Sequence, residues 1–375
     1  MYDAVVAGLG GMGSAALAHL SLRGSRVLGI DQFDALHERG ASSGRTRIIR
    51  QAYFEDPAYV PMLVRAYELW RDLERTTGED IFRLVGLLLA GTPDSEVISG
   101  SLLAAQKHGL PVESLNAAEL RARYPMLRVY DDEAGVFERE AGAVFPERAI
   151  RAHLDLAREH GAQTRFNTEM RAWQSDGQGV SVELGDGTSV RTRSLVLTLG
   201  PWFSQALHEA GVKLEVQRNV QVWFTPRTAA YDAAAFPAFL IERRSLPAPL
   251  YGFPDFGNGV KAAFHGLGAL TDPEALERGI DPQKDVQPLA QALEEWMPGA
   301  SGSFREGKAC MYALTPDRHF VIDRHPRDPR VVLCGGFSGH GFKFASVVGE
   351  IAAQLALEGG TPHAIDFLGL RRFQL

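Results

Sequence analysis

The N-terminal segment alternates between strand-like and helix-like spacing of its apolar residues. Residues 2–7 (YDAVVA) form a short apolar run typical of a buried strand, and residues 14–22 carry apolar positions at helical spacing before Gly24. Residues 25–30 form a second apolar run, which ends at Asp31. Strand, glycine-rich turn, helix, strand and acid in this order predict one dinucleotide-binding unit.

A packed helix is predicted after Asp56. Asp56 and Pro57 are residue types favoured at an N-cap and at the first helical position. Leu63, Tyr67 and Trp70 follow at helical spacing, so we expect one face of this helix to be buried.

The middle of the chain has a β-rich pattern. Residues 180–184 and 189–197 flank Gly185-Asp186-Gly187, a turn sequence favoured in β-hairpins. Further strands are predicted at residues 215–225, 238–242 and 260–265. Segments typical of a dinucleotide-binding fold recur at the start, the middle and the C-terminus around these runs, so the pattern predicts two intertwined domains.

A second glycine-rich turn lies near the C-terminus. Residues 335–344 (GGFSGHGFKF) lie between an apolar run at 331–334 and an amphipathic helix. Glycines at such a turn let backbone N–H groups and a helix N-terminus approach a bound electron-rich group. The turn from Gly8 to Gly13 has the same character, so the two turns are suited to opposite ends of one long cofactor. This points to a flavin dinucleotide, FAD.

The predicted fold class is α/β, with a Rossmann-like FAD-binding domain intertwined with an α+β substrate domain that carries a largely antiparallel sheet. The FAD-binding domain would comprise residues 1–84, 142–212 and 312–375. The substrate domain would comprise residues 85–141 and 213–311.

Each position of the motif Gly8-x-Gly10-x-x-Gly13 has its own role. Gly8 permits a tight turn, Gly10 admits the pyrophosphate, and Gly13 lets the helix pack on the strand. Asp31 is placed to accept hydrogen bonds from the adenosine ribose hydroxyls. The motif predicts dinucleotide binding but does not separate FAD from NAD.

Composition argues against several classes of function. The chain has 375 residues, of which 45% are hydrophobic and 23% charged, as is ordinary for a globular protein. The formal net charge of -7 and the even spread of basic residues argue against nucleic-acid binding. No apolar run approaches the ~18 residues needed to cross a membrane. Cys310 and Cys334 are the only cysteines and a strand is predicted from Tyr2 onward, so we expect a cytoplasmic protein with reduced thiols.

Four motifs occur in the order of one known family. They are SSGRTRIIRQAY (42–53), YGFPDFGNGVKAAFH (251–265), GKACMYALTPDRHFVID (307–323) and the glycine turn at 335–344. Together they resemble the monomeric sarcosine oxidase and N-methyltryptophan oxidase family. Members of this family are FAD-dependent amine oxidases of the D-amino-acid-oxidase-like fold. The resemblance extends from Tyr2 to about Gln374, and the run after the second turn is most similar to the N-methyltryptophan oxidase branch. It implies covalently bound FAD, a secondary-amine amino acid as substrate and oxygen as electron acceptor.

The resemblance assigns roles to the cysteines and to two cations. Cys310 matches the cysteine bonded to the flavin, whereas Cys334 has no counterpart and is expected to be structural. Arg50 and Lys343 match the pair that holds the substrate carboxylate, a task suited to an arginine fork and a lysine point charge. The alternatives are a buried partner of an internal acid for Arg50 and a solvated helix-start lysine for Lys343.

Residues near the reacting groups are implied in the same way. Lys261 matches a lysine on the flavin face opposite the substrate, where a fixed cation would stabilise negative charge developing on oxygen. A lysine on an edge strand is the alternative. His265 matches an active-site histidine, and Tyr251 and Tyr312 match aromatic pocket residues. All three are equally compatible with an ordinary core.

Further residues would contact the cofactor. Arg47 matches an arginine next to the flavin, with a structural salt bridge as its alternative. Gly339, Gly341 and Lys343 belong to the turn whose N–H groups would face the pyrimidine edge of the flavin.

Two positions depart from the family. Ser42-Ser43 stands where the family has a pair of histidines, so Ser43 would change the surroundings of the flavin. Leu240 stands where the sarcosine enzyme has a methionine, and a slightly longer loop follows at residues 243–249. The size of the substrate therefore stays open.

The expected activity is FAD-dependent oxidation of a secondary-amine amino acid by a monomeric enzyme that needs no metal. Hydride would pass to the flavin, the imine would be hydrolysed, and oxygen would be reduced to hydrogen peroxide. Alternative substrates are a cyclic imino acid, such as pipecolate or proline, and a fructosyl amino acid. An NAD-dependent dehydrogenase would have no use for Cys310 or the second glycine turn, and a flavin-binding protein without turnover is the non-enzymatic alternative.

Overall fold

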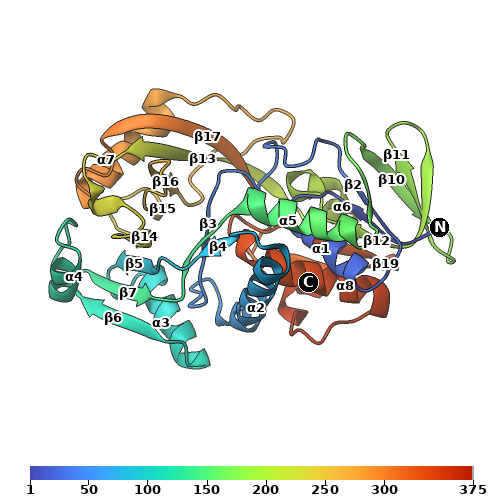
Figure 1. Ribbon diagram of the computed structural model, residues 1–375, viewed down its shortest axis with the longest axis horizontal. Helices are drawn as coiled ribbons and strands as arrows, with labels where there is room; N and C mark the ends of the chain where they lie inside the picture. The colour runs from blue at the N-terminus through green and yellow to red at the C-terminus, as the bar shows by residue number, and fades with distance from the viewer. Residues whose placement is uncertain (374–375) are drawn as a thin grey trace.

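The computed structural model describes residues 1–373, which form an α/β fold with two 8-stranded sheets and one 3-stranded sheet. The two large sheets occupy opposite ends of the molecule (Figure 1). Within residues 1–373, no helix is long and apolar enough to cross a membrane.

The first sheet is built around the predicted dinucleotide unit. Its central strand, β1, pairs in parallel with β2 and β12, and β12 pairs in parallel with β19. The antiparallel strands β10 and β11 extend one edge. The strands are β1 (Tyr2–Ala7), β2 (Val27–Ile30), β9 (Gln163–Arg165), β10 (Met170–Ser175), β11 (Val180–Leu184), β12 (Ser189–Leu197), β18 (Val321–His325) and β19 (Asp328–Gly335).

The second sheet is largely antiparallel, as predicted, with one parallel pair between β5 and β14. Its strands, in spatial order, are β17 (Ser303–Leu314), β13 (Glu215–Thr225), β16 (Val260–Phe264), β15 (Leu250–Phe253), β14 (Ala238–Glu242), β5 (Leu87–Gly91), β7 (Ala134–Glu138) and β6 (Val112–Asn116). The small sheet contains β3 (Arg47–Ile49), β8 (Gly142–Val144) and β4 (Phe82–Arg83).

Helices pack against both large sheets (Figure 1). Those near the first sheet are α1 (Gly11–Leu22), α2 (Val60–Thr77), α5 (Pro146–Glu159), α6 (Ser204–Glu209) and α8 (Ala345–Glu358). Those near the second sheet are α3 (Glu96–His108), α4 (Ala117–Arg123) and α7 (Gln287–Trp296).

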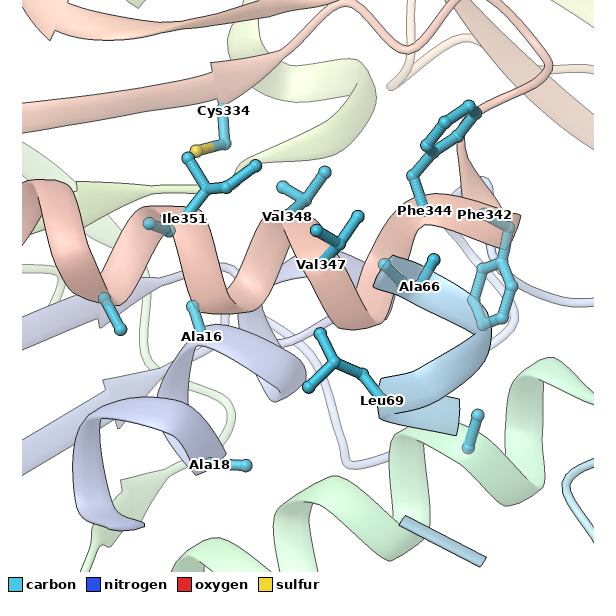
Figure 2. Close-up of a cluster of buried hydrophobic side chains, with 14 of the residues drawn as sticks. Ala16, Ala18, Ala66, Leu69, Cys334, Phe342, Phe344, Val347, Val348 and Ile351 are labelled. Carbon is cyan, nitrogen blue, oxygen red and sulfur yellow. The ribbon is translucent and has the colours of Figure 1, made fainter. Parts of the chain in front are cut away.

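The core beside the second glycine turn is made of α8, α1 and α2. In Figure 2, Val347, Val348 and Ile351 of α8 lie among small side chains such as Ala16 and Ala66. Burying side chains of this size removes them from water at a gain of roughly 1.5–3 kcal/mol each. This packing fixes α8, and with it the turn that precedes α8.

The helices and strands predicted from local sequence patterns are present in the structure, and the differences lie at the ends of these elements. The helix predicted at 14–22 begins earlier, at Gly11, because Gly10 serves as its N-cap and glycines give no apolar signal. Asp56 accepts a hydrogen bond from Ala58 N at 2.7 Å, but it caps the short helix η1 (Pro57–Tyr59) that leads into α2. The predicted hairpin is formed by β11 and β12.

The two large sheets draw their strands from alternating parts of the chain. The first sheet uses residues 2–30, 163–197 and 321–335, and the second uses 87–138 and 215–314. On this basis we propose the domain division 1–84, 142–212 and 312–375 against 85–141 and 213–311, with β17 crossing the last boundary.

Candidate active site

The first glycine turn lies where β1 ends and α1 begins. Gly8 has a φ of 88°, and a Cβ at Gly13 would lie 1.7 Å from the carbonyl oxygen of Gly8. A Cβ at Gly10 would meet no atom closer than Ser42 Oγ at 3.6 Å, and Gly10 lines a cavity. The missing side chain at Gly10 therefore leaves room for a bound group and is not required by protein packing.

Asp31 lies just after β2 and is only 6% exposed. Its Oδ2 accepts a hydrogen bond from Leu9 N at 2.7 Å, and its Oδ1 accepts one from Phe33 N at 2.9 Å. These bonds fix the carboxylate at the wall of the cavity that Gly10 lines, where ribose hydroxyls of a dinucleotide would donate to it.

One cavity of about 510 Å³ joins the two glycine turns. Its size is in the range of cofactor and ligand sites, and its shape links the turn at Gly8 to the turn at Gly339. Together with the space at Gly10 and the position of Asp31, it fits a long dinucleotide such as FAD. Predicted site residues that line it are Gly8, Gly10, Asp31, Arg47, Arg50, Tyr251, His265, Tyr312, Gly339, Gly341 and Lys343. Gly13, Ser43, Lys261 and Cys310 are not among the lining residues.

The second glycine turn connects β19 to the short helix η5 (Phe342–Phe344), which continues into α8. Gly339 has a φ of 84°, and a Cβ there would lie 2.4 Å from the ring of Tyr312. The turn therefore packs directly on an aromatic residue of β17. Gly341 and Lys343 line the cavity at the helix N-terminus, so the positive end of the helix dipole would favour a negatively charged group bound there.

Two buried cations lie at the wall of the cavity. Arg50 is 2% exposed and Lys343 is 5% exposed. Arg50 donates to the Ala52 carbonyl at 2.8 Å and to Glu55 Oε2 at 2.5 Å, whereas Lys343 Nζ donates to the His340 carbonyl at 2.8 Å. The alternative for Lys343, a solvated lysine at a helix start, is wrong, whereas the alternative for Arg50, a buried partner of an internal acid, agrees with its pairing with Glu55. Burial and then the neighbouring Arg50 lower the pKa of Lys343 to about 7, although Glu55 opposes this shift.

Glu55 is a site residue that the sequence patterns did not reveal. Burial alone would raise the pKa of Glu55, but Arg50 and other neighbouring charges outweigh burial and lower it to about 2. The carboxylate is therefore ionised and neutralises Arg50. The only signal in the sequence was an acid five residues after Arg50, which is common in solvated turns.

His265, Tyr251 and Tyr312 form an aromatic wall. The Tyr312 hydroxyl lies 3.4 Å from His265 Nδ1, and their ring centroids are 5.5 Å apart. The ring of Tyr251 lies edge-on to His265 at 6.3 Å. Burial lowers the pKa of His265 to about 4, so this imidazole is uncharged near pH 7.

Lys261 is 1% exposed and lies behind the cavity wall. Its strand, β16, has β13 on one side and β15 on the other, so the edge-strand alternative is wrong. Nζ donates to the carbonyls of Gly44 and Thr46 at 2.7 Å each and contacts Thr46 Oγ1 at 3.2 Å. Burial and then Arg47 hold the pKa of Lys261 well below its usual value.

Cys310 and Cys334 are both buried, unpaired thiols. Cys310 lies on β17 opposite Asn219 of β13, and Gln221 Nε2 lies 3.1 Å from its Sγ. Cys334 lies on β19 in the core of Figure 2, where burial raises the pKa of its thiol to about 12. Cys334 is thus a structural residue.

The segment that holds Arg47 also contains Ser43. Arg47 donates to the Ser43 carbonyl at 2.5 Å, to the Ala41 carbonyl at 2.9 Å and to the Thr46 carbonyl at 2.8 Å. Arg47 also lies 3.5 Å from the amide oxygen of Gln221, and no carboxylate pairs with it among residues 1–373. The hydroxyl of Ser43 is buried and has no hydrogen-bond partner within residues 1–373.

Leu240 lines the cavity and lies opposite Tyr251 in the β14–β15 ladder. The loop after β14 is anchored by Arg243, which forms a buried ion pair with Glu133 at 2.5 Å. In the described chain, 1–373, no cluster of His, Cys, Asp or Glu is arranged to hold a metal ion.

Comparisons with known proteins agree with this geometry. The family described as FAD dependent oxidoreductase (DAO) matches residues 3–355. Monomeric sarcosine oxidase from Streptomyces avermitilis is 44% identical over 377 residues, covering 99% of this chain and 97% of that protein. N-methyl-L-tryptophan oxidase from Yersinia pestis is 35% identical over 376 residues, covering 100% of this chain and 100% of that protein.

Solved structures share the fold. NikD, an unusual amino acid oxidase essential for nikkomycin biosynthesis, superposes with a TM-score of 0.86 at 24% identity, covering 98% of this chain and 97% of that chain. L-proline dehydrogenase from P. horikoshii superposes with a TM-score of 0.85 at 22% identity, covering 99% of this chain and 97% of that chain. The chain therefore belongs to the FAD-dependent oxidoreductase family that includes monomeric sarcosine oxidase and N-methyl-L-tryptophan oxidase.

Proposed function

We propose that this protein is an FAD-dependent oxidase of secondary-amine amino acids, in particular N-methyl amino acids. The observation that carries the proposal is the pair of buried cations, Arg50 and Lys343, at the wall of a cavity that also reaches the dinucleotide turn. Buried charges are costly unless they are paired, Lys343 has no carboxylate partner among residues 1–373, and an α-carboxylate is the anion that Arg50 and Lys343 together would hold.

Arg50 and Lys343 would orient the substrate by its carboxylate. The same cations disfavour a positively charged amine nearby, and His265 adds no charge because its pKa is about 4. The site therefore favours the neutral amine, which is the form able to release hydride. The FAD supplies the acceptor for that hydride, and the imine product is then hydrolysed by water.

Gly339, Gly341 and the helix start at Phe342 would stabilise negative charge at the pyrimidine edge of the flavin through their N–H groups. Arg47 lines the same cavity without a carboxylate partner among residues 1–373, which leaves its charge available to the cofactor. Ser43 lies in the segment that Arg47 binds and would lie close to the flavin.

Lys261 would assist the reduction of oxygen to hydrogen peroxide. Burial lowers the pKa of Lys261, while the carbonyls of Gly44 and Thr46 and the Thr46 hydroxyl around Nζ favour its ammonium form. A fixed positive charge behind the cavity wall would stabilise the negative charge that develops on oxygen.

Cys310 would carry the covalent bond to the flavin. It is a free thiol on β17, and it lies two residues before Tyr312, which lines the cavity. We also propose a monomeric, cytoplasmic enzyme, in line with the name of the sarcosine-oxidase relative and with two unpaired thiols.

A peroxide-coupled screen tests this function. It would compare sarcosine, N-methyltryptophan, pipecolate, proline and fructosyl amino acids, with anaerobic bleaching of the flavin as a second readout. Oxidation of an N-methyl amino acid is the expected result. If pipecolate, proline or a fructosyl amino acid is the best substrate, the substrate class must be revised, and if none bleaches the flavin the oxidase proposal fails.

A further inference from the structure

One aromatic side chain touches both cations of the cavity wall. The ring of Tyr53 has Arg50 Cζ 4.3 Å from its centroid and Lys343 Nζ 5.2 Å from its centroid. Tyr53 is completely buried and does not itself line the cavity. It is therefore in a position to influence the two cations without touching a ligand.

The two cations need such a partner because they repel each other in a buried site. Glu55 pairs with Arg50, whereas no carboxylate pairs with Lys343 among residues 1–373. The negative face of an aromatic ring attracts a cation, and the attraction is larger where water is excluded. Tyr53 can therefore offset part of the repulsion for both side chains at once.

The orientation of the Tyr53 ring is fixed by His340. The Tyr53 hydroxyl forms a hydrogen bond with His340 Nδ1, and His340 Nε2 lies 3.0 Å from the carbonyl oxygen of Arg318. A carbonyl only accepts, so Nε2 carries the hydrogen, Nδ1 accepts, and the Tyr53 hydroxyl donates. The same His340 accepts a hydrogen bond from Lys343 Nζ through its own carbonyl at 2.8 Å.

We propose that Tyr53 is a positioning residue whose ring holds Arg50 and Lys343 beside one another for a ligand carboxylate, with His340 fixing the ring through its hydroxyl. This inference rests on the proposed function, because it takes the two cations as the carboxylate site. Tyr53 would thus set the affinity for the charged end of the substrate and leave the remainder of the substrate unaffected.

The test uses the holoenzyme and two ligands of nearly the same shape. Methoxyacetate has the outline of sarcosine and carries a carboxylate but no amine, and 2-methoxyacetamide is its neutral counterpart. Calorimetry gives the two dissociation constants, and their ratio reports the preference for charge. In the Tyr53→Leu variant this ratio should fall by roughly 5- to 30-fold, the range for one or two buried cation–π contacts.

Tyr59→Phe is the control for the phenylalanine variant at position 53, because both substitutions remove one buried hydroxyl and keep the ring. Tyr59 is equally buried, its ring centroid lies 5.2 Å from that of Tyr53, and its hydroxyl forms hydrogen bonds with His319 and with Phe320 N. Its ring is over neither cation, so its loss of a hydroxyl should leave the ratio unchanged.

If the Tyr53→Leu variant does not fold, a second series of variants that keep an aromatic ring at position 53 replaces it. Phenylalanine and fluorinated phenylalanines at position 53 keep the ring shape, while each added fluorine weakens the negative face. The charge preference should fall stepwise along this series. Equal loss for both ligands, or no change in the series, overturns the inference. If the unmodified protein itself shows no preference for methoxyacetate, the carboxylate site of the proposed function fails, and the inference fails with it.

Discussion

Arg50 is paired with Glu55 inside the cavity, with Nη2 2.5 Å from Oε2. The guanidinium that is expected to receive the substrate carboxylate thus already has an anionic partner, and Lys343 does not. A ligand carboxylate would share Arg50 with Glu55 and would be the first anion to meet Lys343. The charge of the site is therefore set by three groups, and each can be changed separately.

Replacing Glu55 should strengthen carboxylate binding. In the Glu55→Gln variant the repulsion between Glu55 and a ligand carboxylate is removed while a side chain of the same shape remains. At pH 6, where Lys343 is protonated, we expect methoxyacetate to bind on the order of 10-fold more tightly, or about 1.4 kcal/mol. The measurement is a calorimetric dissociation constant, with Glu140→Gln as the control because Glu140 is half exposed and forms an ion pair with the equally exposed Arg71 at 3.5 Å.

Carboxylate affinity should fall as the pH rises through about 7. The pKa of Lys343 is lowered to about 7 in the free protein, and a bound carboxylate favours its protonated form, so binding takes up a proton. Below this pKa the affinity is constant, and above it the affinity falls by up to about 10-fold per pH unit. Methoxyacetate is the suitable probe because it has no group that titrates between pH 5.5 and pH 9.

The imidazoles and the carboxyl group next to the two cations titrate below this pH range. Burial lowers the pKa of His265 to about 4 and that of His340 to about 3, while the charges around Glu55 hold its pKa at about 2. In the Lys343→Met variant the affinity should be lower and should no longer depend on pH in this range. A slope that persists in this variant would assign the titration to a different group.

The oxygen step should depend on Lys261. In the Lys261→Met variant we expect reoxidation of the reduced flavin to slow much more than anaerobic reduction by substrate. Stopped-flow absorbance separates the two half-reactions. Lys213→Met is the control, since Lys213 is an exposed lysine paired with Glu215. Equal slowing of both half-reactions would make Lys261 a structural residue.

The flavin bond should depend on one of the two buried thiols. Protein with Cys310→Ala should release its flavin on acid denaturation, whereas protein with Cys334→Ala should keep its colour in the precipitate. Both substitutions remove the same atom from a buried position, so the comparison isolates the chemistry of the link. Colour retained without Cys310 would contradict the assignment.

Local patterns predicted the elements that depend on neighbouring residues. The unit β1, α1, β2 and Asp31, the hairpin of β11 and β12, and the long strand β13 are each visible in short stretches of sequence because spacing and turn residues determine them. The pairing of β5 with β14 was not visible, since it joins segments that are far apart in the chain.

The site was predictable only in part for the same reason. The family resemblance supplied the positions of Arg50, His265 and Lys343, and the cavity brings these residues together. Glu55 and Tyr53 were missed because an acid before an N-cap and a tyrosine near a helix are common in any sequence. Their roles arise from contacts with Arg50 and Lys343 that exist only in the folded chain.

The interleaving of the two sheets has a consequence for synthesis on the ribosome. β1 acquires its partner β12 only after Leu197 has been made, and β12 acquires β19 only after Leu333. Between these events the chain makes strands β13 to β17 of the second sheet, so all strands of the second sheet have been made before the first sheet receives β18 and β19. The first sheet therefore cannot be completed before β19 has left the ribosome, and capture of a cofactor that needs both glycine turns must follow that step.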